Sequence, residues 1–193
     1  MCLRTLLLAI IAVSSAYPQE STNSALHDSA TGGSGMLYRK DHVFWLTPPP
    51  GWILDNSSGV SQGLQAVFYR RGGSWKQSAS VMYANGVHKD IEAKQTFEQF
   101  IADDSLTFLK RNPNVRIFSA AELPTAKGQV AVIKRYVYSQ YEAVAYIDEP
   151  KVVVLIVLTC RSKDDFDSSY SAFKTLVGSF WFITEDVTFP EHK

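Results

Sequence analysis

An unbroken run of seven apolar residues, 152–158, constrains the fold more than any other stretch of this sequence. Five of the seven are Val or Ile, whose β-branched side chains favour strands over helices. A strand with one face in water alternates apolar and polar residues, and this run does not, so both of its faces are expected to be covered. It is also too short to cross a bilayer, which takes about 20 apolar residues. The run therefore predicts the central strand of a layered domain.

The composition is that of an ordinary globular protein and argues against one class of partner. A chain of 193 residues favours a single domain. The hydrophobic share of 46% and the charged share of 20% are typical of such a domain. Lys plus Arg and Asp plus Glu number 19 each, so the basic excess typical of nucleic-acid binders is missing. We therefore expect no nucleic-acid partner.

A secretory signal peptide is predicted at the start of the chain. Arg4 provides the positive charge of its first region, an apolar stretch of eight residues spans 6–13, and small residues fill 14–16. Eight apolar residues do not make a membrane anchor. We therefore expect a secreted or periplasmic protein, cleaved near Ala16, with no transmembrane anchor after cleavage.

The remaining chain divides by composition into three parts. Residues 17–39 are rich in Ser, Thr, Gly, Ala and Asn without apolar periodicity, which predicts a flexible linker. Residues 40–184 carry the periodic apolar pattern of a folded domain, and 185–193 form a polar tail. The expected organisation is thus one folded domain behind an exported leader.

Two helices are predicted from apolar residues at helical spacing. Phe97, Phe100, Ile101 and Phe108 predict a helix over 96–111, although polar residues at 103–105 interrupt the apolar stripe, and a bend or restart is expected there. The four residues Phe166, Tyr170, Phe173 and Val177 predict a second helix over 163–178. Thr96 with Gln99 forms a capping-box pattern for the first helix, and Ser162 is the N-cap of the second.

Short apolar stretches separated by turn residues predict the strands. Most successive stretches are joined by hairpin-length turns, which favours an antiparallel sheet. Because the central run needs cover on both faces, the predicted fold is α+β, an α/β/α sandwich with a mostly antiparallel central sheet and helices on both faces. The other expected strands are 43–46, 52–54, 64–69, 78–84, 115–123, 129–139, 142–147 and 180–183, and 85–90 is expected to be a loop.

Three stretches, taken in order, resemble PsbP-like domains. This family is named for the extrinsic PsbP protein of photosystem II and shares its fold with a Ran-binding nuclear import factor. The opening reads FWLTPPPGW, the middle reads TFEQFIADDSLTFLKRNPNVRIFSAAELPTAKGQVAVIKRYVYS, and the end reads VVVLIVLTC, then a Ser-capped helix, then VGSFWF. The resemblance covers about residues 41–183 and lies in order and spacing. It implies an α/β/α sandwich and non-enzymatic roles in binding, assembly or chaperoning, and no metal or ligand motif of the family is carried over.

The segment 70–76 is the candidate partner-binding element. It is a predicted hairpin tip that carries three cations and a tryptophan. Because Arg and Trp are enriched at binding hot spots, the candidate partner-binding residues are Arg70, Arg71, Trp75 and Lys76. The alternative is that the tryptophan packs on a neighbouring strand and the cations are merely solvated.

Catalytic patterns are sparse in this sequence. Residues 59–63 fit the nucleophile pattern G-x-S-x-G around Ser61, but that chemistry needs a strand before it and a helix after it. Here a turn cluster precedes the pattern and a strand follows, so a Gly-Ser turn is the preferred interpretation. His88 or His192 would be the base of such a hydrolase. Cys160 ends the central run and is expected to be a buried small hydrophobe, with a reactive thiol as the alternative.

Metal ligation is not predicted from the sequence. The four histidines, His27, His42, His88 and His192, are scattered, and the spacings H-x-H, H-x-x-x-H and C-x-x-C do not occur. We therefore expect no metal and no cofactor. The predicted function is that of an exported, non-catalytic binding or assembly module with an unknown protein partner. The alternatives are a small serine hydrolase using Ser61 and a carrier of an apolar ligand held between sheet and helix.

Overall fold

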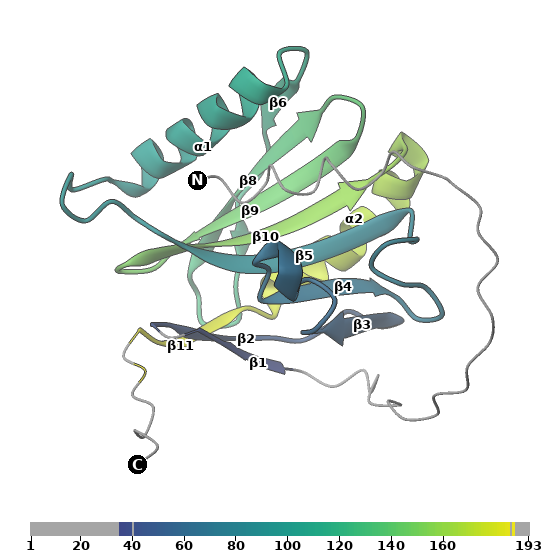
Figure 1. The fold of residues 1–193 in the computed structure, drawn as a ribbon, viewed down its shortest axis with the longest axis horizontal. Helices are drawn as coiled ribbons and strands as arrows, with labels where there is room; N and C mark the ends of the chain where they lie inside the picture. The colour runs from purple at the N-terminus through teal and green to yellow at the C-terminus, as the bar shows by residue number, and fades with distance from the viewer. Residues whose placement is uncertain (1–34, 40, 186, 188–193) are drawn as a thin grey trace.

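A computed structural model of the chain describes residues 35–39, 41–185 and 187. The predicted signal peptide, residues 17–34 of the predicted linker and most of the predicted tail lie outside this part. The described part folds into two antiparallel sheets and two α-helices (Figure 1). Neither of these helices has the length and apolarity that crossing a membrane requires.

The main sheet has eight strands, all paired antiparallel. Seven of them run side by side in the order β3-β4-β5-β10-β9-β8-β6, and the short β7 pairs with β8 beside this path. The bounds in chain order are β3 Trp52–Asp55, β4 Ala66–Arg70, β5 Ser80–His88, β6 Arg116–Ser119, β7 Leu123–Pro124, β8 Val130–Val137, β9 Tyr141–Asp148 and β10 Val152–Cys160. The predicted mostly antiparallel central sheet is therefore confirmed.

The apolar run forms β10 and lies in the middle of the main sheet, as predicted. All nine residues of Val152–Cys160 are buried. Because side chains alternate across a strand, Val154, Ile156 and Leu158 point into one hydrophobic cluster and Val153, Leu155 and Val157 into the other. Both faces of the strand are dry, which explains why its sequence does not alternate.

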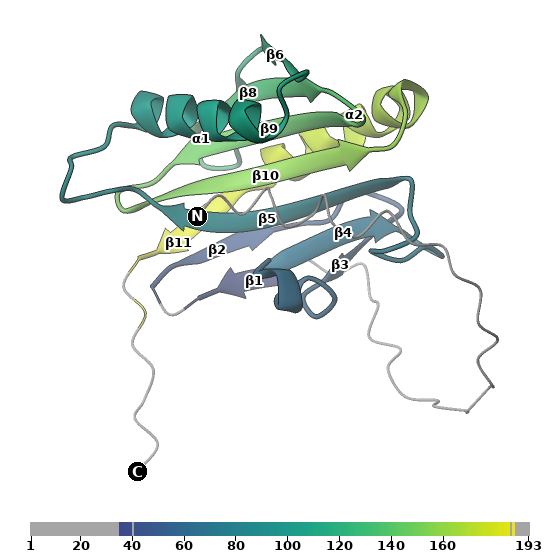
Figure 2. The same cartoon turned by 45° about the horizontal axis from the view of Figure 1, so that its top comes forward.

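One helix covers each face of the main sheet (Figure 2). The first is α1, Phe97–Arg111, which contributes Phe100, Ile101 and Phe108 to one cluster. The second is α2, Lys163–Gly178, which contributes Phe166, Phe173 and Leu176 to the other cluster. The α/β/α arrangement predicted from the sequence is confirmed.

Helix α1 runs without a break through the polar residues that interrupt its apolar stripe, so the predicted bend or restart is wrong. Asp104 is buried, and its Oδ2 accepts a hydrogen bond from the hydroxyl of Tyr146 at 2.7 Å. The Tyr146 hydroxyl in turn contacts that of Tyr136 at 2.8 Å, and Tyr136 contacts Ser105 Oγ at 2.9 Å. The interruption is thus a hydrogen-bond network between the helix and the sheet.

A second, three-stranded sheet joins the two ends of the domain. Its order is β1-β2-β11, with β1 Gly35–Tyr38, β2 Val43–Leu46 and β11 Trp181–Thr184. Phe44 and Phe180 contact each other with ring centroids 5.7 Å apart and belong to the same cluster as α2. This small sheet therefore packs on the α2 side of the main sheet.

Three predicted segments differ from the structure. The single strand expected over 115–123 is two short strands, β6 Arg116–Ser119 and β7 Leu123–Pro124. The stretch 85–90 was expected to be a loop, but β5 continues to His88 because its whole length pairs with β10 from Val152 to Cys160. The predicted linker 17–39 overlaps β1, since residues 35–38 pair with β2. At 85–88 and at 35–38, a partner strand supplies backbone hydrogen bonds to residues whose local composition favours a loop. For β5 this partner is the distant β10, and for β1 it is the adjacent β2.

Candidate functional site

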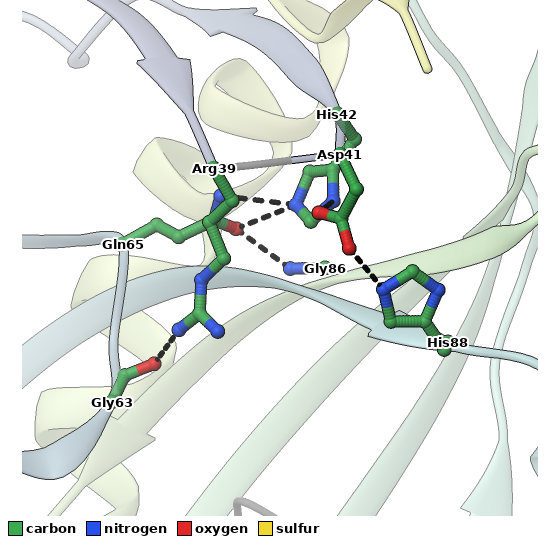
Figure 3. A network of polar contacts seen from close by, with 7 residues as sticks. All are labelled: Arg39, Asp41, His42, Gly63, Gln65, Gly86 and His88. Atoms are coloured by element: carbon green, nitrogen blue, oxygen red, sulfur yellow. Dashed lines mark hydrogen bonds and ion pairs between the residues drawn. The ribbon is translucent and has the colours of Figure 1, made fainter. Parts of the chain in front are cut away.

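Asp41, His42 and His88 form a cluster at one end of the interface between the two sheets (Figure 3). Asp41 and His42 lie in the turn between β1 and β2, where the backbone N–H of Arg39 donates to the carbonyl of His42 at 2.9 Å. His88 is the last residue of β5. Asp41 Oδ1 lies 2.9 Å from His42 Nδ1, and Asp41 Oδ2 lies 2.5 Å from His88 Nε2. The carboxylate therefore bridges two imidazoles from different sheets.

The three side chains differ in their access to solvent. His42 is 1% exposed, whereas the side chains of Asp41 and His88 are 45% and 56% exposed. The ring of His42 is stacked on Phe44 with centroids 6.0 Å apart and an interplanar angle of 6°. One imidazole is thus fixed in the interior, and the cluster opens to solvent on the side of the other two residues.

Gln65 and Gly86 fix the position of the His42 ring. The amide of Gln65 lies against His42 Nε2, with its nitrogen at 3.0 Å and its oxygen at 3.3 Å, and the same oxygen accepts a hydrogen bond from the Gly86 N–H at 2.8 Å. A Cβ on Gly86 would overlap the His42 ring, so only glycine leaves room for it on β5. Gln65 occupies Nε2, and Nδ1 is left as the ring atom that faces Asp41.

The electrostatics of the cluster favour an ionised carboxylate. Burial by itself would raise the pKa of Asp41, but the hydrogen bond and charge of His88, together with His42, hold that pKa below its ordinary value. The guanidinium of Arg39 is engaged elsewhere, since it donates to the carbonyl oxygen of Gly63. Asp41 is therefore an anionic hydrogen-bond acceptor between two ring nitrogens.

Sequence reasoning missed this cluster because it judged the histidines by spacing alone. His42 and His88 are 46 positions apart, and His88 was placed in a loop. Residues 84–88 show no regular alternation of apolar and polar residues, but side chains alternate along any strand, including an extension of the one predicted over 78–84. Extending that strand would have placed His88 on the same face as Gly86.

A second feature is an open groove of about 470 Å³ between α2 and the strands at the β6 edge of the main sheet. Apolar and aromatic side chains contribute much of its lining, among them Phe118, Val137, Tyr141 and Phe166. Phe118 is 47% exposed, a large value for a phenylalanine. The groove therefore presents aromatic surface to solvent beside a strand that has only one neighbour in the sheet order.

Arg135 gives this groove a positive charge. Its guanidinium lies 4.5 Å from the centroid of the Tyr170 ring and 5.7 Å from that of Phe166. Its Nε is buried and has no hydrogen-bond partner among the described residues. The other charged residues of the groove are engaged, because Lys163 pairs with Asp167 at 2.5 Å and Glu142 accepts from Thr159 at 3.0 Å. Arg135 is thus the cation of the groove whose Nε has no hydrogen bond within the described residues.

The hairpin segment predicted to bind a partner is only partly accessible. Trp75 is buried at 7% exposure and packs edge-on against Tyr83, with centroids 6.2 Å apart. Arg70 lies over the ring of Trp52 at 5.4 Å and donates to the carbonyl of Ser168 at 3.4 Å. Arg71 and Lys76 are exposed. That these four residues bind a partner stays a prediction.

The two candidate nucleophiles lie in unfavourable surroundings for catalysis. Ser61 belongs to a three-residue 3-10 helix, Val60–Gln62, rather than to a strand-to-helix elbow, and no hydrogen bond joins it to a histidine in the described ranges. Burial raises the pKa of Cys160 to about 12 even though its thiol donates to Ser80 Oγ at 3.4 Å. The thiolate is the nucleophilic form, and the raised pKa disfavours that form at neutral pH.

Comparisons with known proteins bear on the fold. No family model and no curated protein match this sequence. Among solved structures, the chain is similar to cyanobacterial PsbP (CyanoP) from Synechocystis, with a TM-score of 0.52 and 15% identity over 83% of this chain and 98% of that one. It is also similar to the Ran-binding protein Mog1p of Saccharomyces cerevisiae, with a TM-score of 0.48 and 13% identity over 79% and 96% of the two chains.

At these identities the likeness concerns the arrangement of strands and helices and does not extend to a shared activity. The order of elements that suggested PsbP-like domains in the sequence is the order seen in the structure. This chain therefore has the fold of the PsbP-like proteins.

Proposed function

We propose that this protein is an exported, non-catalytic binding or assembly module whose ligand is a segment of another protein. The PsbP-like fold supports this proposal, because the roles known for such domains are mostly in binding and assembly. The pattern of residues 1–16 supports export. The observation that carries the proposal is the groove beside α2, with its exposed Phe118 and its unpartnered Arg135 Nε.

The occupant that fits this groove best is an extended peptide carrying a carboxylate. β6 lies at the end of the strand order, so one of its edges is available for pairing with a further strand. The aromatic lining offers pockets for apolar side chains of such a peptide. Arg135 offers a donor to its carboxylate, in the geometry for which arginine is favoured at interfaces.

Site-specific photo-crosslinking tests this assignment. A photoreactive phenylalanine analogue at Phe118 should crosslink to one partner protein in the exported fraction of the source cells. The same analogue at Ile91, which is also exposed at 57%, is the matched control and should give no such product. Equal products at both positions, or none at Phe118, would overturn the proposal.

The crosslinked segment then provides a direct binding assay. A synthetic peptide of that segment should bind the purified protein, and Arg135→Gln should weaken binding by about tenfold or more, since a charged hydrogen bond contributes about 1.5–3 kcal/mol. Lys174→Gln, which removes an exposed cation on α2, is the control and should bind as the wild type does. Unchanged affinity in the Arg135 variant would show that the peptide does not bind in this groove.

Export is tested separately. The mature protein isolated from the secreted or periplasmic fraction should begin at Tyr17, as mass spectrometry of the intact chain would show. Retention of the whole leader in a cytosolic fraction would contradict export and leave the groove proposal intact.

A second candidate function is the carriage of an apolar ligand. A wide groove of about 560 Å³ between α1 and the start of β8 is lined mainly by apolar side chains, including Phe97, Ile101, Val130 and Val132. An apolar molecule would bury surface there that water now covers. Native mass spectrometry of protein purified from its source should then reveal a bound lipid, and mass equal to that of the bare chain would exclude tight carriage.

A further inference from the structure

We infer that Asp41, His42 and His88 form a binding site for a divalent transition-metal ion of the zinc class. The three potential ligand atoms, one carboxylate oxygen and two imidazole nitrogens, lie within 4.8 Å of one another. Ligands around one zinc ion are about 2.0–2.2 Å from the metal, so they lie about 3.3 Å apart in tetrahedral geometry. Small rotations of the two exposed side chains, Asp41 and His88, would reach that geometry.

The buried histidine provides the observation that points to a cation. His42 Nδ1 is buried and has no aligned hydrogen-bond partner among the described residues, although it lies 2.9 Å from a carboxylate oxygen. A buried nitrogen whose nearest acceptor is poorly aligned loses much of the hydrogen bond that would offset its desolvation. In the tautomer whose Nε2–H donates to Gln65 Oε1 at 3.3 Å, Nδ1 presents a lone pair toward Asp41, and a metal ion between the nitrogen and the oxygen would satisfy both.

The surroundings of His42 match those of a metal ligand. Metal-binding histidines usually donate their second ring N–H to a fixed acceptor, which holds the tautomer and the ring. In the same tautomer Gln65 Oε1 provides that acceptor, and this oxygen is itself held by the Gly86 N–H at 2.8 Å. The glycine leaves the space that the ring fills. A Zn²⁺ site with three protein ligands leaves its fourth position for water, and here that position faces solvent because Asp41 and His88 are half-exposed.

The donor set also selects the kind of ion. Imidazole nitrogen with a carboxylate suits zinc, cobalt, nickel and copper, whereas magnesium and calcium take oxygen ligands. Because His42 comes from the β1–β2 turn and His88 from β5, the bound ion would hold the small sheet against the main sheet. Binding would therefore stabilise the native state, in which the two sheets are packed together.

Titration calorimetry with ZnCl₂ tests the site, on the full mature chain without a histidine tag and after removal of metals by a chelator. We expect one equivalent of Zn²⁺ to bind and thermal unfolding to shift to higher temperature. Co²⁺ should bind in competition with Zn²⁺ and give visible absorption bands typical of a four-coordinate site with nitrogen ligands. Absence of heat, thermal shift and cobalt bands would overturn the inference.

Variants of the two exposed ligands locate the binding. His88→Gln and Asp41→Asn should each weaken Zn²⁺ binding by at least tenfold, and both residues are exposed enough for the variants to fold. Asp90→Asn, an exposed carboxylate two residues after His88, is the matched control and should bind as the wild type does. Gln65→Met, which removes the amide that holds His42, should weaken binding by about 10–100-fold. Stoichiometric binding that survives both ligand variants would place the metal elsewhere and contradict this assignment.

Discussion

The two faces of the main sheet are both buried, but they differ in the polar groups that they bury. The face toward α2 is covered by α2 and the small sheet, and its cluster consists mainly of alanines, branched aliphatics and phenylalanines, with Trp52, Met82 and Cys160. The face toward α1 carries Tyr136 and Tyr146, whose hydroxyls form a chain of hydrogen bonds to Asp104 and Ser105 of the helix. Helix α2 is held on the first face by apolar packing. On the second face, directional hydrogen bonds add to the packing and fix the position of α1.

The two helices are therefore expected to be destabilised by different kinds of substitution. Where apolar volume holds a helix, a truncated side chain costs most because it leaves a cavity. Where a buried hydrogen-bond network positions a helix, removing one partner lowers the free energy of unfolding most, because the other partner keeps a buried polar atom without a hydrogen bond. Substitutions on the two helices test this contrast.

The largest effect is expected for Phe173→Ala on α2. Phe173 is fully buried, so truncation should lower the free energy of unfolding by about 3–5 kcal/mol. Leu109→Ala on α1, at a residue 39% exposed, is the matched control and should cost less than about 1 kcal/mol. Urea unfolding followed by circular dichroism measures both. Equal losses would mean that volume does not distinguish the two sites.

A buried carboxyl outside the tyrosine network should make stability depend on pH. Glu149 is 5% exposed, and burial, with the nearby charges of Asp148 and Glu185, raises its pKa from 4.5 to about 7 despite a hydrogen bond from Gln129. Between these values the native state binds the proton that the unfolded chain releases. The contribution of Glu149 to the free energy of unfolding is therefore complete below pH 4.5. It is lost as the pH rises through 7, and the total loss is about 3 kcal/mol.

Glu149→Gln tests this contribution, because it should remove the fall and leave a variant that is more stable than wild type at pH 8. Urea unfolding at pH 5 and pH 8 measures the change. Glu122→Gln, at an exposed residue, should leave the difference between the two pH values as it is in the wild type. A wild-type protein that is equally stable at both values would contradict the raised pKa.

A double-mutant cycle on the tyrosine network measures how strongly α1 is coupled to the main sheet. Asp104→Asn and Tyr146→Phe each disturb a 2.7 Å hydrogen bond between buried groups and should each cost about 1–3 kcal/mol. The pair should be non-additive by at least about 0.5 kcal/mol, because the two residues contact each other. Asp103→Asn, an exposed neighbour on the same helix, should change stability by less than about 0.5 kcal/mol. Strict additivity would show that the bond does not couple the helix to the sheet.

The smallest effects are expected at the helix caps, where the two helices should behave alike. Thr96 Oγ1 accepts from the Gln99 N–H at 3.2 Å, and Ser162 Oγ accepts from the Asp165 N–H at 3.1 Å. Thr96→Ala and Ser162→Ala should each cost about 1 kcal/mol, since each cap satisfies one backbone donor. Shifts in the urea midpoint measure them. A cost at Thr96 well above that of Asp104→Asn would mean that the cap, rather than the network, positions α1.

Local patterns in the sequence were enough to predict the layers of this fold. The period-3.6 pattern and the caps predicted both helices within one residue of their observed bounds, Phe97–Arg111 and Lys163–Gly178. The apolar run predicted a strand buried on both faces, because a segment without polar residues has no side to turn to water. These features depend on neighbours along the chain, and so the sequence reveals them directly.

The contacts of the buried polar residues follow from the packing of distant segments and are visible in the tertiary structure alone. In the sequence, Asp104 is only a polar residue that interrupts an apolar stripe. In the structure, it accepts a hydrogen bond from Tyr146, whose hydroxyl also contacts that of Tyr136. His42 and His88 read as isolated until the pairing of β5 with β10 and the packing of the small sheet brought them to one carboxylate. The physical reason is that burial follows local periodicity, whereas a site needs atoms from distant segments at a few ångströms, and only the packing of the sheets sets those distances.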